Sequence, residues 1–155
     1  MTSDRTLLDF GLGIADTAGA VYGETATGLG AEFIVWTANC DAAWGEETCT
    51  ANNSIRLSTP SFKLRPEVVE TWYYAYRATG DGEYQDLAWS VFVAVEKFCR
   101  TETGFSAISD VNAADGGDKL DEQPSFLFAE LLKYLWLIQF DVNVSPSRLR
   151  RRSSD

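Results

Sequence analysis

The sequence predicts an all-α protein built from antiparallel helical hairpins, and three observations lead to this prediction. Apolar side chains recur at helical spacing in several stretches of the 155-residue chain. Pro66 and Pro124 each stand where a helix would begin. Short breaks such as "GDGE" separate the periodic stretches, and helices joined by short breaks pack as antiparallel neighbours. At this length the chain is about one domain, on a prior of roughly 100–200 residues per domain.

The first 62 residues divide into a helix and a loop-rich stretch. Residues 4–22 are predicted to be helical, although each glycine in a helix interior costs about 1 kcal/mol relative to alanine. The helical spacing there is carried by Leu7, Phe10, Leu12, Ile14 and Val21. Residues 23–62 are rich in Gly, Thr, Asn and Ser, so we expect long loops with at most a short strand at "EFIVW". A loop region this long is often functional.

Three further helices follow. One is expected from Pro66 to about Thr79, with the acidic Glu67 in its first turn, where it suits the helix dipole. The next is expected over roughly 84–100 and the last over 124–140, where a wide apolar face recurs at helical spacing. Residues 142–155 contain "SRLRRRSSD", and we expect a disordered basic tail there, with a nucleic-acid or localisation patch as the alternative.

Charge and composition exclude several function classes. The chain has 13 basic and 23 acidic residues and a net charge of −10, so its bulk charge repels nucleic acid and anionic membranes. It has no histidine, which excludes a His-based triad and a His-ligated zinc site. We expect no transmembrane segment, because no run of 18 apolar residues occurs, and the N-terminal "TSDRTLL" lacks a signal-peptide core.

The three cysteines leave the redox state open. Cys40 and Cys49 flank "CDAAWGEETC" and could close a small surface disulfide, or could remain reduced. Because the number of cysteines is odd, at least one of the three cannot be paired within the chain, and the sequence does not identify which one. A metal site formed by the three cysteines is disfavoured, because no close C-x-x-C spacing is present.

The stretch "KLRPEVVETWYYAYR" carries the first candidate site residues. Glu67 and Glu70 lie three apart, on one face of the expected helix, with Arg65 just before them. Both acids could be solvated first-turn charges. The aromatic surroundings instead indicate a buried helix, in which carboxylates need a partner such as Arg65, a cation or a polar ligand.

The last helix contains a second candidate acid. Glu130 is the only acid in "SFLFAELLKYLWL", and an ion pair with Lys133 would explain it structurally. If its helix end met that of Glu67 and Glu70, the result would be a carboxylate-lined pocket with aromatic walls. Such pockets suit sugars, and paired carboxylates perform glycoside hydrolysis.

These stretches resemble the class I α-1,2-mannosidases of glycoside hydrolase family 47, in their fungal form. The resemblance covers about residues 8–141 and includes "LRPEVVETWYYAYRATGDGEYQDLAWSVFVAVEKFCRTETGFSAISDVN" and "SFLFAELLKYLWL". Upstream, "TATGLGAE" is similar to the family's T-x-T-G-I-G-P-E. Members fold as an (α/α) barrel of seven helical hairpins. They remove terminal α-1,2-linked mannose from N-glycans with inversion, using bound Ca²⁺, in the secretory pathway (ER, Golgi or secreted).

The resemblance implies a role for each candidate residue. Glu67 matches the general base that activates the attacking water. Residues that contact the mannose in the −1 subsite are matched by Arg65, Phe126 and Glu130. Acids that hold the waters around calcium are matched by Glu32 and Glu70. An acid-lined pocket without histidine is consistent with calcium, which prefers oxygen ligands. The implied partner is a high-mannose N-glycan or another α-1,2-mannoside.

Departures from the family pattern limit these roles. The family's general acid lies on an upstream hairpin that this sequence does not contain. Where the family ends in "TEAHP", whose Thr ligates calcium, this chain has "VSPSRLRRRSSD". Ala18-Gly19 replaces a Cys-His pair, so the family's core disulfide cannot form, and Cys99 matches the family's free thiol. Pro124 and Ala31 also replace the usual residues.

We therefore expect an incomplete barrel, in which residues 1–141 are the C-terminal part of a mannosidase catalytic domain. The isolated chain should be inactive, because its general acid and calcium-ligating Thr are missing. Apolar patches should be exposed along the 66–79 and 124–140 helices. The alternatives are an inactive remnant or mannose-binding module that keeps part of the sugar pocket, and an unrelated helical interaction domain.

Overall fold

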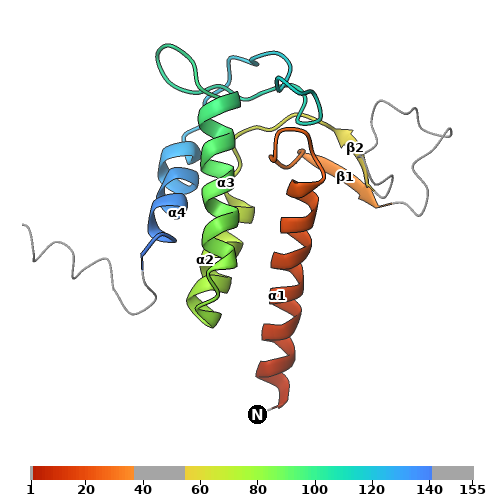
Figure 1. Ribbon diagram of the computed structural model, residues 1–155, viewed down its shortest axis with the longest axis vertical. Helices are drawn as coiled ribbons and strands as arrows, with labels where there is room; N and C mark the ends of the chain where they lie inside the picture. Colours follow the sequence, from red (N-terminus) through yellow and green to blue (C-terminus); the bar gives the residue numbers. More distant parts are fainter. Residues whose placement is uncertain (1, 37–54, 141–155) are drawn as a thin grey trace, which may run out of the picture.

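The computed structural model describes residues 2–36 and 55–140, and the all-α prediction is confirmed for this part of the chain (Figure 1). Helix α2 runs antiparallel to α3, with α1 and α4 on either side (Figure 1). The loops between α3 and α4 cross one end of the helices. The helical elements in chain order are α1 (Thr2–Gly23), α2 (Glu67–Thr79), α3 (Glu83–Phe98), the π-helical segment η2 (Leu127–Leu131) and α4 (Leu132–Leu137).

The α2–α3 hairpin forms where the sequence predicted it. Gly80 ends α2 with φ 75°, a left-handed conformation that glycine adopts without a steric penalty, and its N–H bonds the Tyr76 carbonyl at 2.8 Å. The Asp81 carboxylate then accepts the Glu83 N–H at 3.0 Å at the start of α3. Pro66 is the residue just before α2, so the helix begins at Glu67, one residue later than predicted.

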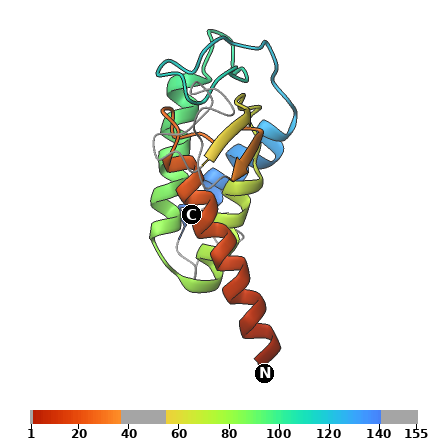
Figure 2. The same ribbon diagram turned by 90° about the vertical axis from the view of Figure 1, so that its right-hand side faces the viewer.

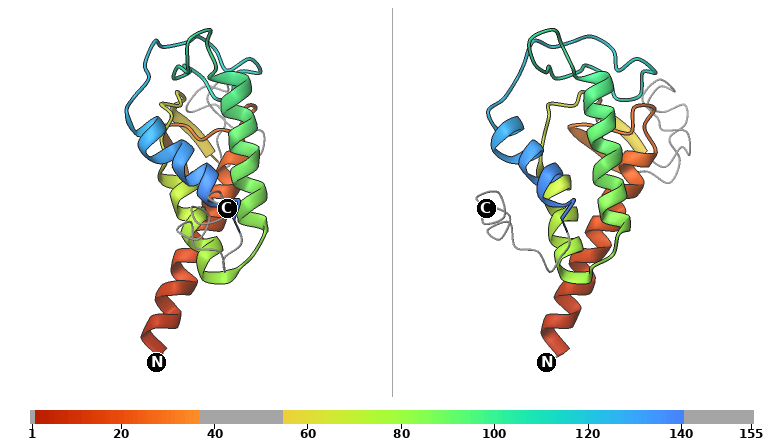
Figure 3. Two further views of the ribbon diagram at one scale, coloured as in Figure 1. Left: turned by 90° about the vertical axis from the view of Figure 1, so that its left-hand side faces the viewer. Right: turned by 60° about the vertical axis from the view of Figure 1, so that its left-hand side comes forward.

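Helix α1 packs on this hairpin through small residues. Ala15 is fully buried, and its carbonyl accepts a 3.0 Å hydrogen bond from the Trp72 indole of α2. A Cβ at Gly19 would lie 3.1 Å from the Leu87 side chain of α3, so this glycine allows a close approach. The N-terminal turns of α1 project beyond the other helices, as Figures 2 and 3 show.

A short β-hairpin follows α1. Strand β1 (Phe33–Trp36) lies within the predicted "EFIVW" strand, and it pairs antiparallel with β2 (Ile55–Thr59), which the sequence prediction assigned to loop. Ile55 and Leu57 of β2 are buried and anchor the hairpin to the core. The connection between the strands contains Cys40 and Cys49, so the question of whether they pair concerns residues outside the described part of the chain.

The last helix differs from its prediction. Helical structure begins at Phe126 and not at Pro124, and its first part is the π-helical η2, in which the Leu132 N–H bonds the Leu127 carbonyl five residues back. Segments of this kind are rare and often occur at functional sites. Helix α4 then ends at Leu137. The predicted basic tail, 142–155, lies outside the described residues.

Exposed apolar side chains occur where the sequence predicted them. Tyr74 of α2, Phe128 of η2 and Trp136 of α4 are each more than half exposed. Helix α1 carries further exposed apolar residues, which were not predicted. Among the described helices, none is long and apolar enough to cross a membrane.

Candidate functional site

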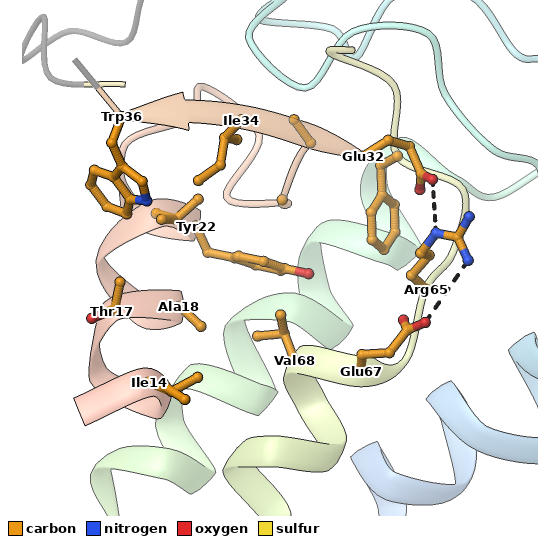
Figure 4. Close-up of a pocket in the computed structure, with 14 residues that line it drawn as sticks. Ile14, Thr17, Ala18, Tyr22, Glu32, Ile34, Trp36, Arg65, Glu67 and Val68 are labelled. Atoms are coloured by element: carbon orange, nitrogen blue, oxygen red, sulfur yellow. Dashed lines mark hydrogen bonds and ion pairs between the residues drawn. The ribbon is translucent and has the colours of Figure 1, made fainter. Parts of the chain in front are cut away.

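Arg65 lies between two carboxylates at the start of α2. Its Nε donates a 2.7 Å hydrogen bond to Glu32 Oε2, and its Nη1 lies 3.8 Å from Glu67 Oε1 (Figure 4). The hydrogen bond to Glu32 raises the pKa of the Arg65 guanidinium. The side chain of Glu32 is 7% exposed and that of Glu67 is 64% exposed, so the arginine joins a buried acid to an open one.

Glu32 is held by the segment that precedes α2. Its backbone N–H donates to the Ser61 carbonyl at 2.9 Å, and its Oε1 accepts the Lys63 N–H at 3.2 Å. Phe62 of the same segment bridges to Ile108 in the loop after α3. Leu64, fully buried, takes a φ of 60°, which is uncommon for a residue with a side chain and typical of constrained functional segments. The position of Arg65 is thus fixed by a segment that is hydrogen-bonded and buried on both sides of it.

The two acids in the first turn of α2 have different environments. Glu67 is open to solvent beside Arg65, whereas Glu70 is half-buried and accepts a 2.5 Å hydrogen bond from the Tyr134 hydroxyl of α4. The sequence left two interpretations of these acids open, solvated first-turn charges or buried carboxylates with a partner, and each applies to one of them. Glu67 is a solvated first-turn acid, and Glu70 has the partner that a half-buried carboxylate requires.

The Phe126 ring lies beside Arg65, whereas no ion pair joins Glu130 to Arg65 among the described residues. The Arg65 Cζ lies 5.8 Å from the centroid of the Phe126 ring, within cation–π range. Glu130 is half-buried in η2. Within the described residues no ion pair joins it to Lys133, whose Nζ instead lies 4.2 Å from the Tyr134 ring centroid. The ion pair with Lys133, offered above as a structural explanation for Glu130, is therefore absent from the described part of the chain.

A cavity of about 390 Å³ opens beside this cluster, between α1, β1 and the start of α2 (Figure 4). Its charged end is formed by Glu32, Arg65 and Glu67, and the rest is mainly apolar. Tyr22 also lines it, with its ring edge-on to Trp72 at 5.5 Å. Burial, then the charges of Glu67 and Glu32, raise the pKa of the Tyr22 hydroxyl, so it remains a neutral donor.

Tyr22 and Tyr134 are the two site residues that the sequence prediction missed. The Tyr134 hydroxyl donates to Glu70, 64 residues away in sequence, and Tyr22 lines the cavity together with Glu32 and Glu67. Neither tyrosine belongs to a recognisable local motif. The only sequence signal was their place on an apolar helical stripe, which predicts burial and not a polar role.

The described carboxylates do not form a complete metal shell. No group of three or more Asp, Glu, Cys or His side chains close enough to hold an ion occurs within residues 2–36 and 55–140. Ca²⁺ takes six to eight oxygen ligands, and both oxygens of Glu32 already accept protein hydrogen bonds. Glu70 keeps Oε2 available, since its bond to Tyr134 uses Oε1. These residues fit a role in holding metal-bound water and not direct ligation.

The chain is similar to fungal mannosidases by three comparisons. Residues 1–149 match the family described as glycosyl hydrolase family 47. A probable mannosyl-oligosaccharide alpha-1,2-mannosidase 1B of Aspergillus clavatus is 44% identical over 133 residues, which is 86% of this chain and 26% of that protein. The mannosyl-oligosaccharide alpha-1,2-mannosidase of Penicillium citrinum is 43% identical over 133 residues, with the same shares.

The structural comparison agrees. The alpha-1,2-mannosidase from Trichoderma reesei superposes with a TM-score of 0.76 at 36% identity, covering 90% of this chain and 30% of that one. The hairpins described above are thus part of an (α/α) barrel fold, as predicted. The chain spans about a quarter of the length of the curated relatives it matches.

Proposed function

This chain belongs to glycosyl hydrolase family 47, and from that premise we propose that it carries the base-bearing part of an inverting α-1,2-mannosidase site. Residues 1–141 would be the C-terminal part of the catalytic domain. The substrate would be terminal α-1,2-linked mannose on a high-mannose N-glycan. The observation that carries the proposal is the position of Arg65 between Glu32 and Glu67, with the Phe126 ring beside it.

Each residue has a task suited to its surroundings. The Phe126 ring would pack on the apolar face of the mannose, and the Arg65 guanidinium would donate hydrogen bonds to its hydroxyls. Glu67 is the acid open to solvent, so water can reach its carboxylate. Glu32, buried and hydrogen-bonded, would hold Arg65 in place. Glu130 would accept a hydrogen bond from a second sugar hydroxyl.

Hydrolysis would proceed with inversion. Glu67 accepts a proton from a water molecule as the water oxygen forms a bond to the anomeric carbon, on the face opposite the leaving group. The glycosidic bond breaks, and the leaving oxygen takes its proton from a general acid. By the family resemblance, that acid belongs to an upstream hairpin that this sequence does not contain.

We propose that Ca²⁺ binds next to this site and contacts Glu32 and Glu70 through water molecules. A bound Ca²⁺ supplies positive charge that coordinates hydroxyl and water oxygens. Glu32 and Glu70 would accept hydrogen bonds from the waters around it, which the free Oε2 of Glu70 permits. An N-glycan substrate would put the parent protein in the secretory pathway. The net charge of −10 disfavours nucleic acid as a partner.

Titration of the 155-residue chain with 1-deoxymannojirimycin tests the site. We expect calorimetry to detect binding that strengthens when Ca²⁺ is added and that Arg65→Ala abolishes. Absence of binding with and without Ca²⁺ would show that the sugar pocket is not formed.

A second assay tests the assignment of roles. Incubation of the chain with α-1,2-mannobiose should release no mannose, because the general acid is missing. Release of mannose that disappears in Glu67→Gln would overturn that expectation and show that the chain itself supplies an acid. Binding that never leads to turnover, even in a completed domain, would favour the mannose-binding module.

A further inference from the structure

A second cavity, of about 670 Å³, lies between α1 and the turn that joins α2 to α3, and we call it the acidic groove. Its lining is partly apolar and partly acidic, and includes Leu12, Asp16, Gly19, Asp81, Glu83 and Leu87. The cavity beside Arg65 shares none of the residues that line the acidic groove. The groove is therefore separate from the candidate sugar site.

The acids of the groove have no cation beside them in the described part of the chain. Asp16, Asp81 and Glu83 form no ion pair among residues 2–36 and 55–140. The hydrogen bonds of Asp16 and Asp81 come from neutral donors, the Tyr84 hydroxyl at 2.8 Å and the Glu83 N–H. Burial raises the pKa of Tyr84 most, and the charges of all three acids raise it further, so they gather around one point. The groove is thus a concentration of uncompensated negative charge.

The chain leaves the described structure close to this groove. Helix α4 runs toward the same end of the molecule as the turn between α2 and α3 (Figure 1). Gln85, in the first turn of α3, donates a 2.8 Å hydrogen bond from its side chain to the Ile138 carbonyl just after α4. This bond places the exit of the chain two residues along α3 from Glu83, and the groove lies on the α1 side of the same turn.

The sequence that follows is strongly basic. Arg148, Arg150, Arg151 and Arg152 supply four of the 13 basic residues of the chain within five positions. The eight residues from Phe140 to Arg148 can span up to about 26–29 Å, which exceeds the roughly 10–12 Å diameter of a helix. Arginine also pairs with carboxylates through two parallel hydrogen bonds. The segment 148–152 therefore has both the charge and the reach to occupy the groove.

We propose that the arginine segment 148–152 of this chain binds in the acidic groove and joins the C-terminal tail to α1 and to the turn between α2 and α3. The guanidinium groups pair with the groove acids, and their methylene stems pack on Leu12 and Leu87. Each exposed ion pair contributes little, but attachment to the same chain gives the segment an effective concentration on the order of millimolar.

The docking goes beyond the proposed function, because neither the groove nor the tail takes part in the sugar site. It also gives the basic tail a role other than the nucleic-acid patch that its composition allows. Arginines that pair with acids of their own chain are not available to phosphates.

Limited trypsin digestion of the 155-residue chain tests the docking. Trypsin cleaves after arginine, and it reaches the segment only while the segment is undocked. A synthetic peptide of residues 141–155, digested in parallel and followed by mass spectrometry, gives the rate for an undocked tail. At low salt we expect cleavage within 148–152 to be about tenfold slower in the chain than in the peptide. In 1 M NaCl, where the screening length is about 3 Å, the two rates should be equal.

Two double variants locate the docking site. Asp81→Asn with Glu83→Gln removes two groove charges, keeps the acceptor that caps α3, and should raise the cleavage rate to that of the peptide. Glu102→Gln with Asp115→Asn is the matched control, and it should keep the protection. It too changes an exposed glutamate and an exposed aspartate that accepts a backbone N–H, but in the loops at the opposite end of the helices (Figure 1).

The outcomes separate the proposal from its alternatives. Cleavage of the chain at the peptide rate in low salt would overturn it, and this comparison needs no variant. Equal loss of protection in the two double variants would also overturn it, since net charge alone would then be responsible. Protection that increases with protein concentration would point to a second copy as the partner. Docking as expected in a chain that binds no 1-deoxymannojirimycin would support this inference and refute the proposed function.

Discussion

The hydroxyl of Tyr134 lies 2.5 Å from Glu70 Oε1 and joins α4 to α2 across 64 residues of sequence. This hydrogen bond is the main cause, and burial the second, of a raised pKa at Tyr134. Because Glu70 is held in this way, it does not compete with Glu67 for Arg65. The two neighbouring acids therefore have different roles: Glu70 connects α2 to α4, and Glu67 is the candidate base.

Tyr134→Phe removes that hydrogen bond and keeps the ring. We expect the free energy of unfolding to fall by about 1.5–3 kcal/mol, the range for a hydrogen bond to a charged group. Urea denaturation measures it. Tyr73→Phe is the control, because the Tyr73 ring also packs near Tyr134 but its hydroxyl bonds no described residue. Equal losses for the two variants would show that the tie contributes nothing.

Arg65→Lys should weaken 1-deoxymannojirimycin binding by about tenfold. Arginine reaches Glu32 and Glu67 through different nitrogens, and the single ammonium of lysine cannot reproduce this planar geometry. Calorimetry gives the dissociation constant. Arg77→Lys, in the exposed last turn of α2, should leave it unchanged. Full affinity in Arg65→Lys would mean that only the charge matters.

Gly30→Ala tests the close packing at the cavity. A Cβ there would lie 2.2 Å from Cε2 of the Tyr22 ring, so the ring must move. We expect a loss of about 1–3 kcal/mol in unfolding free energy, as for other overpacked positions. Gly13→Ala is the control, since its Cβ meets nothing within 4 Å and alanine favours the helix. A neutral Gly30→Ala would show that Tyr22 is freely displaced.

Stability should decrease with pH above about 9. Burial raises the pKa of Cys99 from 9.0 to about 12, and burial with the Asp16 hydrogen bond raises that of Tyr84 from 10.0 to about 12. The unfolded chain therefore loses these protons first, so the stabilisation is complete below pH 9 and decreases toward pH 12. Tyr84→Phe should flatten the decrease between pH 10 and 12 in urea unfolding experiments. An unchanged slope would exclude Tyr84 as a contributor.

Cys99 should resist alkylation in the folded protein. Its side chain is fully buried, and its raised pKa keeps it a thiol, whereas the thiolate is the reactive form. We expect iodoacetamide labelling, followed by peptide mapping, to be at least about 100-fold slower than in urea. Rapid labelling of Cys99 in buffer would reveal opening of the core around α3.

Local signals in the sequence predicted α2 and α3 well. Proline before α2, glycine after it and a clear apolar stripe on each helix act within a few residues. Strand β2 was missed because "IRLST" is short and is stabilised by pairing with β1 and by burial of Ile55 and Leu57. The π-helical turn η2 was missed because an apolar helical pattern does not distinguish a four-residue from a five-residue hydrogen bond.

In the candidate site, too, local features were predicted and long-range ones were not. Arg65 and Glu67 are two residues apart in sequence, so a local pattern was enough to single them out. The pairing of Glu70 with Tyr134, and the exposure of Tyr22 to the cavity, depend on elements more than 50 residues from one another or on the loop after α1. The exposure of Leu7, Phe10 and Ile14 on α1 was not predicted, because an apolar pattern at helical spacing predicts burial.

The bond from Trp72 to Ala15 spans 57 residues, and this separation sets an order of events during synthesis. Helix α1 leaves the ribosome before α2, but its buried contact does not exist until Trp72 has been translated. At about 5–20 residues per second, the interval is roughly 3–11 s. During that time Val21 and Tyr22, which are buried in the folded structure, remain exposed on the nascent helix, where a chaperone can bind them.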